Sequence, residues 1–220
     1  MFDQQTVEML LVGVWDTLYM TVAATFFSYV FGMVMGVVLV ICRKDGIRPN
    51  ALVYNVLDVV VNLTRSFPFL ILMIAVIPFT RFLVGTTIGN NATVVPLVLA
   101  AAPFVARLVE SSLKEVDAGV IEAAKSMGAS TWQIIVKVLL PEAKPSLLVG
   151  AAISVTTILG YSAMAGFTGG GGLGDIAIRY GYHRYQTDMM MVTVVLLVII
   201  VQLIQEVAMR MSRKSDKRIR

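Results

Sequence analysis

Long apolar stretches separated by short polar segments dominate the pattern of this chain. Residues 17–42 contain no Asp, Glu, Lys or Arg, and a helix of that length measures about 39 Å, enough to cross a membrane with some tilt. Similar stretches follow, and together they predict spans at about 14–42, 52–84, 93–113, 146–166 and 187–208. Five spans place the two termini on opposite sides. The pattern therefore predicts an all-α polytopic membrane protein in which residues 1–220 form one domain.

The composition supports this class of protein. Apolar residues make up 57% of the chain and charged residues 15%, whereas soluble domains average about 45–50% and about 25%. So few charges cannot cover the water-facing surface of a soluble domain of this size, which excludes an ordinary soluble enzyme and a disordered protein. The net charge of +4 is too small to indicate binding to nucleic acid.

Lysine and arginine are distributed unevenly over the predicted loops. Of the 18 such residues, fourteen lie in segments 43–50, 107–145 and 206–220, and three lie in loops on the other side. The remaining one, Arg65, falls inside a hydrophobic stretch. Because cytoplasmic loops are enriched in these residues, the distribution predicts an outside N-terminus and a cytoplasmic C-terminus.

The first predicted span carries a ridge of small residues. Ser28, Gly32 and Gly36 repeat every four positions, a spacing that lets another helix approach closely. The partner helix is either another part of the same chain or a second copy.

The second predicted span carries a polar stripe. Four residues share one helix face because they are spaced by three or four positions: Asn55, Asp58, Asn62 and Arg65. A charge at the bilayer centre costs roughly 2.5–3.5 kcal/mol, so this face does not point at lipid tails. Either Asp58 and Arg65 pair near the cytoplasmic interface, or the stripe lines an inward-facing aqueous vestibule. Pro68 then interrupts the helix, and broken helices at membrane depth often border a cavity.

The cytoplasmic segment 114–145 is too long for a simple turn and contains two short helical patterns. Asp117 fits an N-cap, and the helix that follows has three apolar residues at the spacing of one face: Val120, Ala124 and Met127. Gly128 fits the position where a positive φ ends a helix. Ser130 and Gln133 then predict a capping box that opens a second helix.

The charges of this segment favour a protein partner. Residues 107–145 carry five basic and five acidic side chains, whereas a helix that lies on a membrane has a strongly basic polar face. Pro141 and Pro145 fit the first turn of new helices. The segment therefore predicts two short helices at an angle, exposed near Gly128 and suited to docking onto protein.

Several short motifs resemble those of one transporter family. Glu122-Ala123-Ala124, then Gly128, then Leu140-Pro141 resembles the EAA loop of ABC importer permeases, with Val138 where the pattern prefers Ile. Four further stretches are similar to methionine ABC importer permeases: RSFPF at 65–69, IPFTRFLVGTTIG at 77–89, GYSAMAG at 160–166 and GGLGDIAIRYGY at 171–182. The match covers nearly the whole chain.

The resemblance implies a multi-pass permease of the bacterial inner membrane that imports methionine by alternating access. It implies a homodimer, two separate ATP-binding subunits that use ATP and Mg²⁺, and an external substrate-binding lipoprotein, with membrane lipids around the complex. The EAA loop would sit in a cleft of the ATPase, where Glu122 makes polar contacts, the alanines permit close approach and Gly128 supplies the bend. The coupling residues implied are Glu122, Ala123, Ala124, Met127, Gly128 and Ala129.

The residues themselves predict no enzymatic site and no bound cofactor. The sequence has no Gly-Lys pair, so it has no phosphate-binding loop of the G-x-x-x-x-G-K-[ST] type. His183 is the only histidine, and no set of three or four metal ligands is evident. Energy for active transport would therefore come from a partner.

A path for methionine should be mostly apolar with a few hydrogen-bond donors. The candidates for the gate or path are Arg65, Pro68, Tyr161, Ser162 and Met164, and ordinary helix packing is the alternative for each. Residues 166–188 hold seven glycines, which predicts either a flexible connector or an ordered re-entrant turn that receives the binding protein.

Other functions stay open at this point. The chain could be an ABC permease for another small amino acid or organic solute. It could also be an ion-coupled carrier with Asp58 and Arg65 as a relay, although such carriers commonly show internal repeats and none is evident here. A non-transporting scaffold protein is the third alternative.

Overall fold

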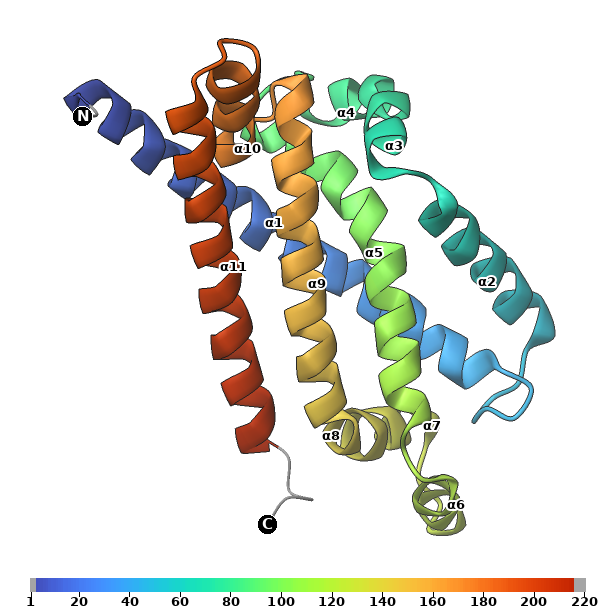
Figure 1. The fold of residues 1–220 in the computed structure, drawn as a ribbon. Helices are drawn as coiled ribbons and strands as arrows, with labels where there is room; N and C mark the ends of the chain where they lie inside the picture. The colour runs from blue at the N-terminus through green and yellow to red at the C-terminus, as the bar shows by residue number, and fades with distance from the viewer. Residues whose placement is uncertain (1–2, 216–220) are drawn as a thin grey trace. The chain divides into compact units, whose positions relative to one another are not determined.

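The computed structural model describes residues 3–215, and the side chains of residues 3–212 (Figure 1). The described chain is built from helices joined by loops. The α-helices are α1 Gln4–Cys42, α2 Ala51–Ser66, α3 Phe69–Ala75, α4 Ile77–Val84, α5 Asn90–Lys114, α6 Ala118–Ser126, α7 Thr131–Ile134, α8 Leu140–Glu142, α9 Lys144–Met164, α10 Gly172–Ile176 and α11 Thr187–Ser215. Two π-helical segments, η1 Ile135–Leu139 and η3 Ala177–Tyr182, and the 3₁₀ segment η2 Ala165–Thr168 complete the order.

Contacts divide the described chain into two compact units. Unit 1 takes residues 3–27, 67–101 and 155–205, and unit 2 takes residues 28–66, 102–154 and 206–215. The four longest helices, α1, α5, α9 and α11, each contribute residues to both units. The single domain expected from the sequence stays a prediction.

Within residues 3–215, four helices are long and apolar enough to cross a membrane, namely α1, α5, α9 with η2, and α11, and the broken pair α2–α3 would make a fifth. These helices leave large apolar side chains uncovered, including Trp15 and Phe26 on α1 and Leu203 on α11. A soluble monomer rarely exposes apolar surface on this scale. The structure therefore agrees with the all-helical class. Four of the five predicted spans correspond to single helices.

The first span is longer than predicted. Helix α1 begins at Gln4 rather than near residue 14. Asp3 explains the earlier start, because its Oδ1 accepts hydrogen bonds from the backbone N–H of Thr6 at 2.9 Å and from the Thr6 hydroxyl at 2.7 Å. A carboxylate at this position satisfies N–H groups that have no partner inside the helix.

The segment predicted as one span over 52–84 forms α2, α3 and α4, so the predicted break at Pro68 is confirmed and a second break, at Val76, was not predicted. Pro68 precedes α3 with φ −59° and ψ 132°. Proline has no N–H to continue the ladder of α2 and disfavours helical geometry in Phe67 before it. Pro78 lies in the first turn of α4, where the missing N–H costs nothing.

The ridge of small residues on α1 packs inside the chain. In unit 2, a Cβ added to Gly32 would lie 2.7 Å from Val105, and one added to Gly36 would lie 2.7 Å from Val109, both on α5. Real Cβ atoms do not approach so closely, so the two glycines allow α1 and α5 to touch. Of the two partners considered for this ridge, the structure supports the intrachain one.

In unit 1 the chain between α9 and α11 is an ordered turn rather than a flexible connector. This glycine-rich turn, residues 165–182, comprises η2, α10 and η3, and all five residues of α10 are buried. Thr17 on α1 accepts a hydrogen bond from the backbone N–H of Leu173 at 2.9 Å, and Thr93 on α5 donates one to the carbonyl of Gly170 at 3.3 Å. Long-range polar contacts thus hold the turn.

Candidate functional site

The candidate site is the hairpin of residues 117–143, which belongs to unit 2 and joins α5 to α9. It opens on Asp117, whose Oδ1 accepts a hydrogen bond from the N–H of Gly119 at 2.7 Å. Helix α6 ends at Ser126, and Gly128 follows with φ +77°. The N–H groups of Gly128 and Ala129 bond to the carbonyls of Lys125 and Ala124 at 2.9 and 3.1 Å. The predicted N-cap and glycine turn are therefore confirmed.

The second arm of the hairpin opens on the predicted capping box. The N–H of Gln133 donates to Ser130 Oγ at 3.3 Å, and the N–H of Ser130 donates to Gln133 Oε1 at 2.8 Å. Both contacts satisfy N–H groups at the start of α7 that would otherwise lack a partner. The two caps fix where each arm starts without help from any partner.

Only one of the three residues predicted to share an apolar face on α6 is buried. Ala124 is 4% exposed, whereas Val120 is 43% and Met127 is 81% exposed. Helix α6 is nine residues long, and it rests on the rest of unit 2 through Ala124 and half-buried Ile121. Val120 and Met127 therefore remain free for another contact, while the close approach that Ala124 permits is to this chain's own core.

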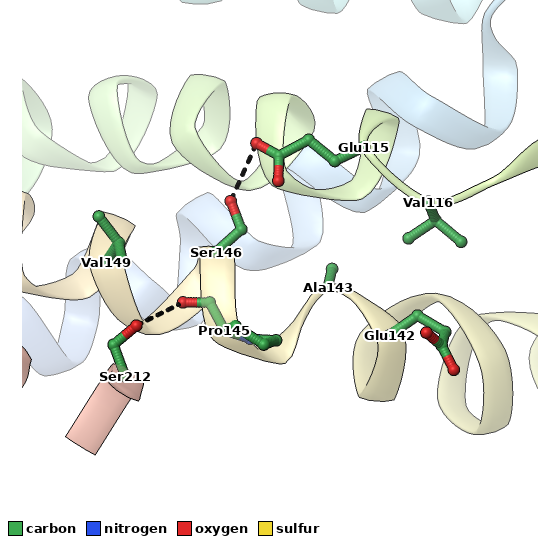
Figure 2. A pocket seen from close by; sticks show the side chains of 8 residues that line it. All are labelled: Glu115, Val116, Glu142, Ala143, Pro145, Ser146, Val149 and Ser212. Carbon is green, nitrogen blue, oxygen red and sulfur yellow. Dashed lines mark hydrogen bonds between the residues drawn. The ribbon is translucent and has the colours of Figure 1, made fainter. Parts of the chain in front are cut away.

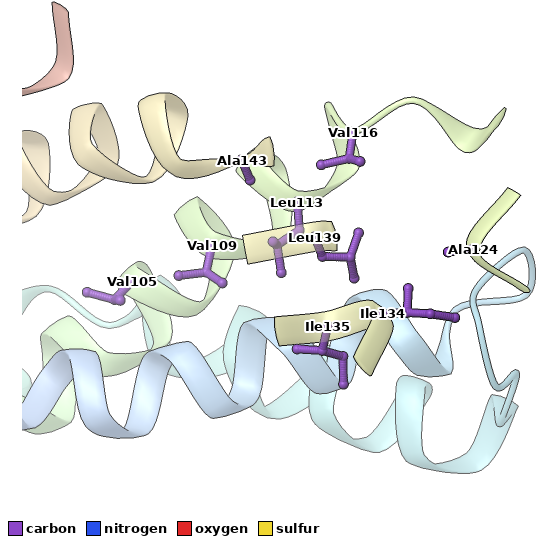
Figure 3. Close-up of a cluster of buried hydrophobic side chains, with 9 residues drawn as sticks. All are labelled: Val105, Val109, Leu113, Val116, Ala124, Ile134, Ile135, Leu139 and Ala143. Atoms are coloured by element: carbon purple, nitrogen blue, oxygen red, sulfur yellow. The ribbon is translucent and has the colours of Figure 1, made fainter. Parts of the chain in front are cut away.

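A buried apolar cluster anchors the hairpin (Figure 3). Its members come from α5, from the loop after α5 and from both arms of the hairpin, and we call it the anchor cluster. They are Val105, Val109, Leu113, Val116, Ala124, Ile134, Ile135, Leu139 and Ala143. Ile134 is 1% exposed and Leu139 is fully buried, so removing either would leave a cavity. The hairpin is therefore a fixed projection of unit 2.

Hydrogen bonds also join the two ends of the hairpin at its base. Ser146 Oγ at the start of α9 donates to Glu115 Oε1 at 3.0 Å and lies at hydrogen-bond distance, 3.0 Å, from Ser112 Oγ. Figure 2 shows Ser146 and Glu115 at a pocket of about 280 Å³, where Ser212 of α11 donates to the carbonyl of Pro145 at 3.2 Å. The two ends of the hairpin are thus held together.

The outer surface of the hairpin combines apolar and polar side chains. We define five of its exposed residues as the docking face: Val120, Glu122, Ala123, Met127 and Trp132. Trp132 is 72% exposed in the first turn of α7. The motif comparison did not single it out, although a tryptophan directly between Ser130 and Gln133 of a capping box is a local signal of an outward-facing aromatic residue.

The polar stripe of α2 makes a different ion pair from the one predicted. The Asp58 carboxylate pairs with Arg107 on α5, and Asn62 Oδ1 accepts from the same guanidinium at 2.8 Å. Arg107 also donates to Glu110 at 2.5 Å, and Lys114 donates to the other oxygen of Glu110 at 2.5 Å. Glu110 is 3% exposed, and a buried carboxylate needs such partners. Among the described side chains, Arg65 forms none of these ion pairs and is exposed.

The candidate gate residues are only partly brought together. Tyr161 stacks on Phe69, which follows Pro68, with ring centroids 4.6 Å apart, and both belong to unit 1. Ser162 is buried and donates to the carbonyl of Leu159 at 2.8 Å, whereas Met164 is 46% exposed. Arg65 belongs to unit 2. No group of three His, Cys, Asp or Glu residues within 3–215 is placed to hold a metal ion.

Comparisons with known proteins agree with the motifs. The chain is 51% identical over 211 residues to the probable D-methionine transport system permease protein MetI of Vibrio cholerae serotype O1, which covers 96% of this chain and 94% of that relative. It is also 51% identical over 154 residues to the D-methionine transport system permease protein MetI of Escherichia coli K12, with 70% and 71% covered.

Solved structures share the fold. A chain of the MetNI methionine ABC transporter in an inward facing conformation superposes with a TM-score of 0.97 at 47% identity, covering 98% of this chain and 100% of that one. A chain of an amino acid ABC transporter solved with histidines, at 18% identity, has a TM-score of 0.78, with 96% and 95% covered. This second likeness concerns the fold alone.

The family model described as binding-protein-dependent transport system inner membrane component matches residues 28–220. That range contains the hairpin, the anchor cluster and the glycine-rich turn. The EAA-like motif at 122–141, the fold and the relatives all agree with this match. The chain therefore belongs to the family of binding-protein-dependent transport system inner membrane components.

Proposed function

We propose that this chain is the membrane-spanning subunit of an ATP-driven importer that moves methionine into the cytoplasm by alternating access. The substrate is taken from the names of relatives that are 51% identical to this chain. The observation that carries the mechanism is the docking face, an exposed surface on a hairpin that the anchor cluster and two caps hold in place.

The proposed orientation has the N-terminus outside and the C-terminus in the cytoplasm. Fourteen of the 18 lysines and arginines then lie on the cytoplasmic side, in agreement with the usual enrichment of these residues there. The same orientation puts the hairpin in the cytoplasm. An ATP-binding subunit would have to bind on that side.

The hairpin is proposed to receive the force of ATP hydrolysis from a separate subunit. Met127 and Trp132 offer apolar surface of the kind that forms interface contacts, and Glu122 and Ala123 stand exposed beside them. The chain has no phosphate-binding loop of its own. The proposal assigns ATP and Mg²⁺ to two ATP-binding subunits, one for each copy of a homodimer, and delivery of the substrate to an external binding protein.

The proposed path for methionine includes the predicted gate residues. The stacked pair Phe69–Tyr161 joins α3 to α9 directly after the Pro68 break, and a break in a helix at membrane depth provides irregular backbone beside a path. Ser162 bonds within α9, so among these residues Tyr161 is the stronger candidate for contact with substrate. Arg65, Pro68 and Met164 complete the proposal.

The test is uptake of labelled L- and D-methionine into proteoliposomes that contain the chain with its ATP-binding subunit and binding protein. We expect uptake that requires ATP on the cytoplasmic side of the membrane. Excess unlabelled methionine should reduce this uptake. Competition by a different amino acid alone would assign another substrate to the same permease.

An ion-coupled carrier is not favoured, because family membership places the chain with binding-protein-dependent systems. The relay required for it would also need Asp58 and Arg65 together, whereas Asp58 pairs with Arg107. Uptake that continues without ATP and follows a pH gradient would nevertheless reverse this conclusion.

A further inference from the structure

The loop between α1 and α2 lies against the hairpin, although no motif marks it. Ile47 in this loop packs against the anchor cluster, which also contains Ala124 of α6. Gly46 and Ile47 form one side of a pocket of about 200 Å³, and Ile121, Glu122 and Lys125 of α6 also line it. Helix α6 and the α1–α2 loop, far apart in the sequence, therefore line one pocket and pack on one cluster.

The α1–α2 loop is built to be stiff. The N–H of Arg48 bonds to the carbonyl of Ile41 at 3.1 Å, and the N–H of Asn50 bonds to that of Cys42 at 2.9 Å, so the loop folds back on the last turn of α1. A Cβ at Gly46 would collide with the Ile41 carbonyl, which explains why glycine stands there.

The far end of the loop is equally fixed. The Asn50 side chain accepts the N–H of Val53 at 3.2 Å and so caps the start of α2. Farther along α2, the pair of Asp58 with Arg107 and the hydrogen bond from Arg107 to Asn62 join α2 to α5. The loop is thus tied to α1 at one end and to α2 at the other.

We propose that Ile47 is a positioning residue of the coupling mechanism: it passes the displacement of α6 through the α1–α2 loop into α1 and α2. This inference rests on the proposed function. Val40 and Ile41 of α1 also pack against the anchor cluster, and Ile47 adds a contact from the loop that leads on to α2. With this contact, all the helices of unit 2 around the hairpin respond together.

The test compares Ile47→Ala with Leu52→Ala. Leu52 is the matched control, because it is a similar apolar residue near the start of α2 that is 76% exposed and outside the anchor cluster. In proteoliposomes of the full complex, we expect Ile47→Ala to keep ATP hydrolysis and lose about two- to tenfold in solute taken up per ATP. Leu52→Ala should match the wild type.

Rescue by a conservative variant separates positioning from folding. Ile47→Val should fall between wild type and Ile47→Ala in solute taken up per ATP, and it keeps the question answerable if the alanine variant does not assemble. The inference would be overturned if solute taken up per ATP were unchanged in both Ile47 variants, whether hydrolysis and uptake stay normal or fall equally. Absence of ATP-driven uptake in the wild-type complex would instead refute the proposed function.

Discussion

The hairpin and the glycine-rich turn both connect consecutive long helices, yet they are built on opposite plans. The hairpin starts each arm with a side-chain cap, buries apolar residues at its base and exposes Met127 and Trp132 at 81% and 72%. The glycine-rich turn instead buries the whole of α10 and lets backbone touch backbone at its glycines. One connection presents a surface, and the other fills the interior of its own unit.

This difference separates two uses of a loop in a transporter subunit. A presented surface needs a rigid base and side chains without an internal role, so substitutions on it should alter partners more than folding. A filled interior has no such freedom, since nearly every added atom meets a neighbour.

Gly174→Ala should have the largest effect, because a Cβ there would collide with the carbonyl of Ala163 on α9. Neither backbone can move aside without unpacking the turn. We therefore expect the free energy of unfolding to fall by about 3 kcal/mol or more, at the upper end for overpacking. Fluorescence-detected size exclusion after heating measures it. Gly160→Ala is the control, since nothing lies within 4 Å of its added Cβ, and equal behaviour of the two variants would refute the packing account.

Ile134→Ala tests the base of the hairpin. Ile134 is 1% exposed in the anchor cluster, and truncation of a buried isoleucine costs about 2–5 kcal/mol. We expect a lower midpoint of thermal unfolding and weaker capture of the ATP-binding subunit. A normal midpoint with normal capture would show that the hairpin does not need its anchor.

Trp132→Ala tests the docking face two residues away. The exposed side chain contributes little to folding, so the unfolding midpoint should stay within the error of the wild type. Affinity for the ATP-binding subunit should fall by about 2 kcal/mol, as expected for an interface tryptophan, and surface plasmon resonance or co-purification can measure this. Trp132→Phe should recover most of the affinity; if both variants bind like wild type, Trp132 is not part of the interface.

Gly128→Ala tests the bend between the two arms. Nothing lies within 4 Å of an added Cβ. The expected loss of stability is therefore only that of a left-handed conformation for a residue with a Cβ, about 1–2 kcal/mol. Because the bend sets the angle of α6, uptake per ATP should fall while hydrolysis continues, and Gly128→Val should uncouple more strongly. Gly128→Asn, which tolerates this conformation better, should be milder, and full transport by Gly128→Val would contradict the role of the bend.

The smallest effect concerns the buried charge of the glycine-rich turn. Burial raises the pKa of the Asp175 carboxyl above its usual 3.8, and Arg179 offsets part of the rise. The folded state thus favours the protonated form, so this contribution to stability is complete below pH 3.8 and is lost as pH rises through the folded pKa. As pH rises through this range, wild type should lose slightly more stability than Asp175→Asn. A difference in stability between the two that does not change with pH would contradict this prediction.

Local signals in the sequence were sufficient for the frame of the hairpin. Asp117, Gly128 and the Ser130–Gln133 box each act within a few residues, so their structure can be predicted without knowledge of the rest of the fold. Pro68 marked the break for the same reason, although the segment around it forms three helices rather than one span.

Long-range contacts were beyond prediction. The partner of Asp58 is Arg107, 49 residues away, and a helix face alone favoured Arg65. Ala124 and Met127 lie on the same side of α6 by spacing, but only Ala124 meets the anchor cluster, because the helix is short and rests on one point. Burial of the glycine-rich turn depends on Thr17 and Thr93 from other helices, which no local pattern reveals.

Site-directed cross-linking can show whether the docking face binds an ATP-consuming partner. In a Cys42→Ser background, which removes the only cysteine, Met127→Cys is treated with a short bifunctional thiol reagent in membranes that contain the complex with single-cysteine ATP-binding subunits. The account predicts a covalent adduct between the two chains that is absent for a cysteine at Leu52. Labelling of position 127 without any such adduct, in a complex that still takes up methionine with ATP, would contradict it.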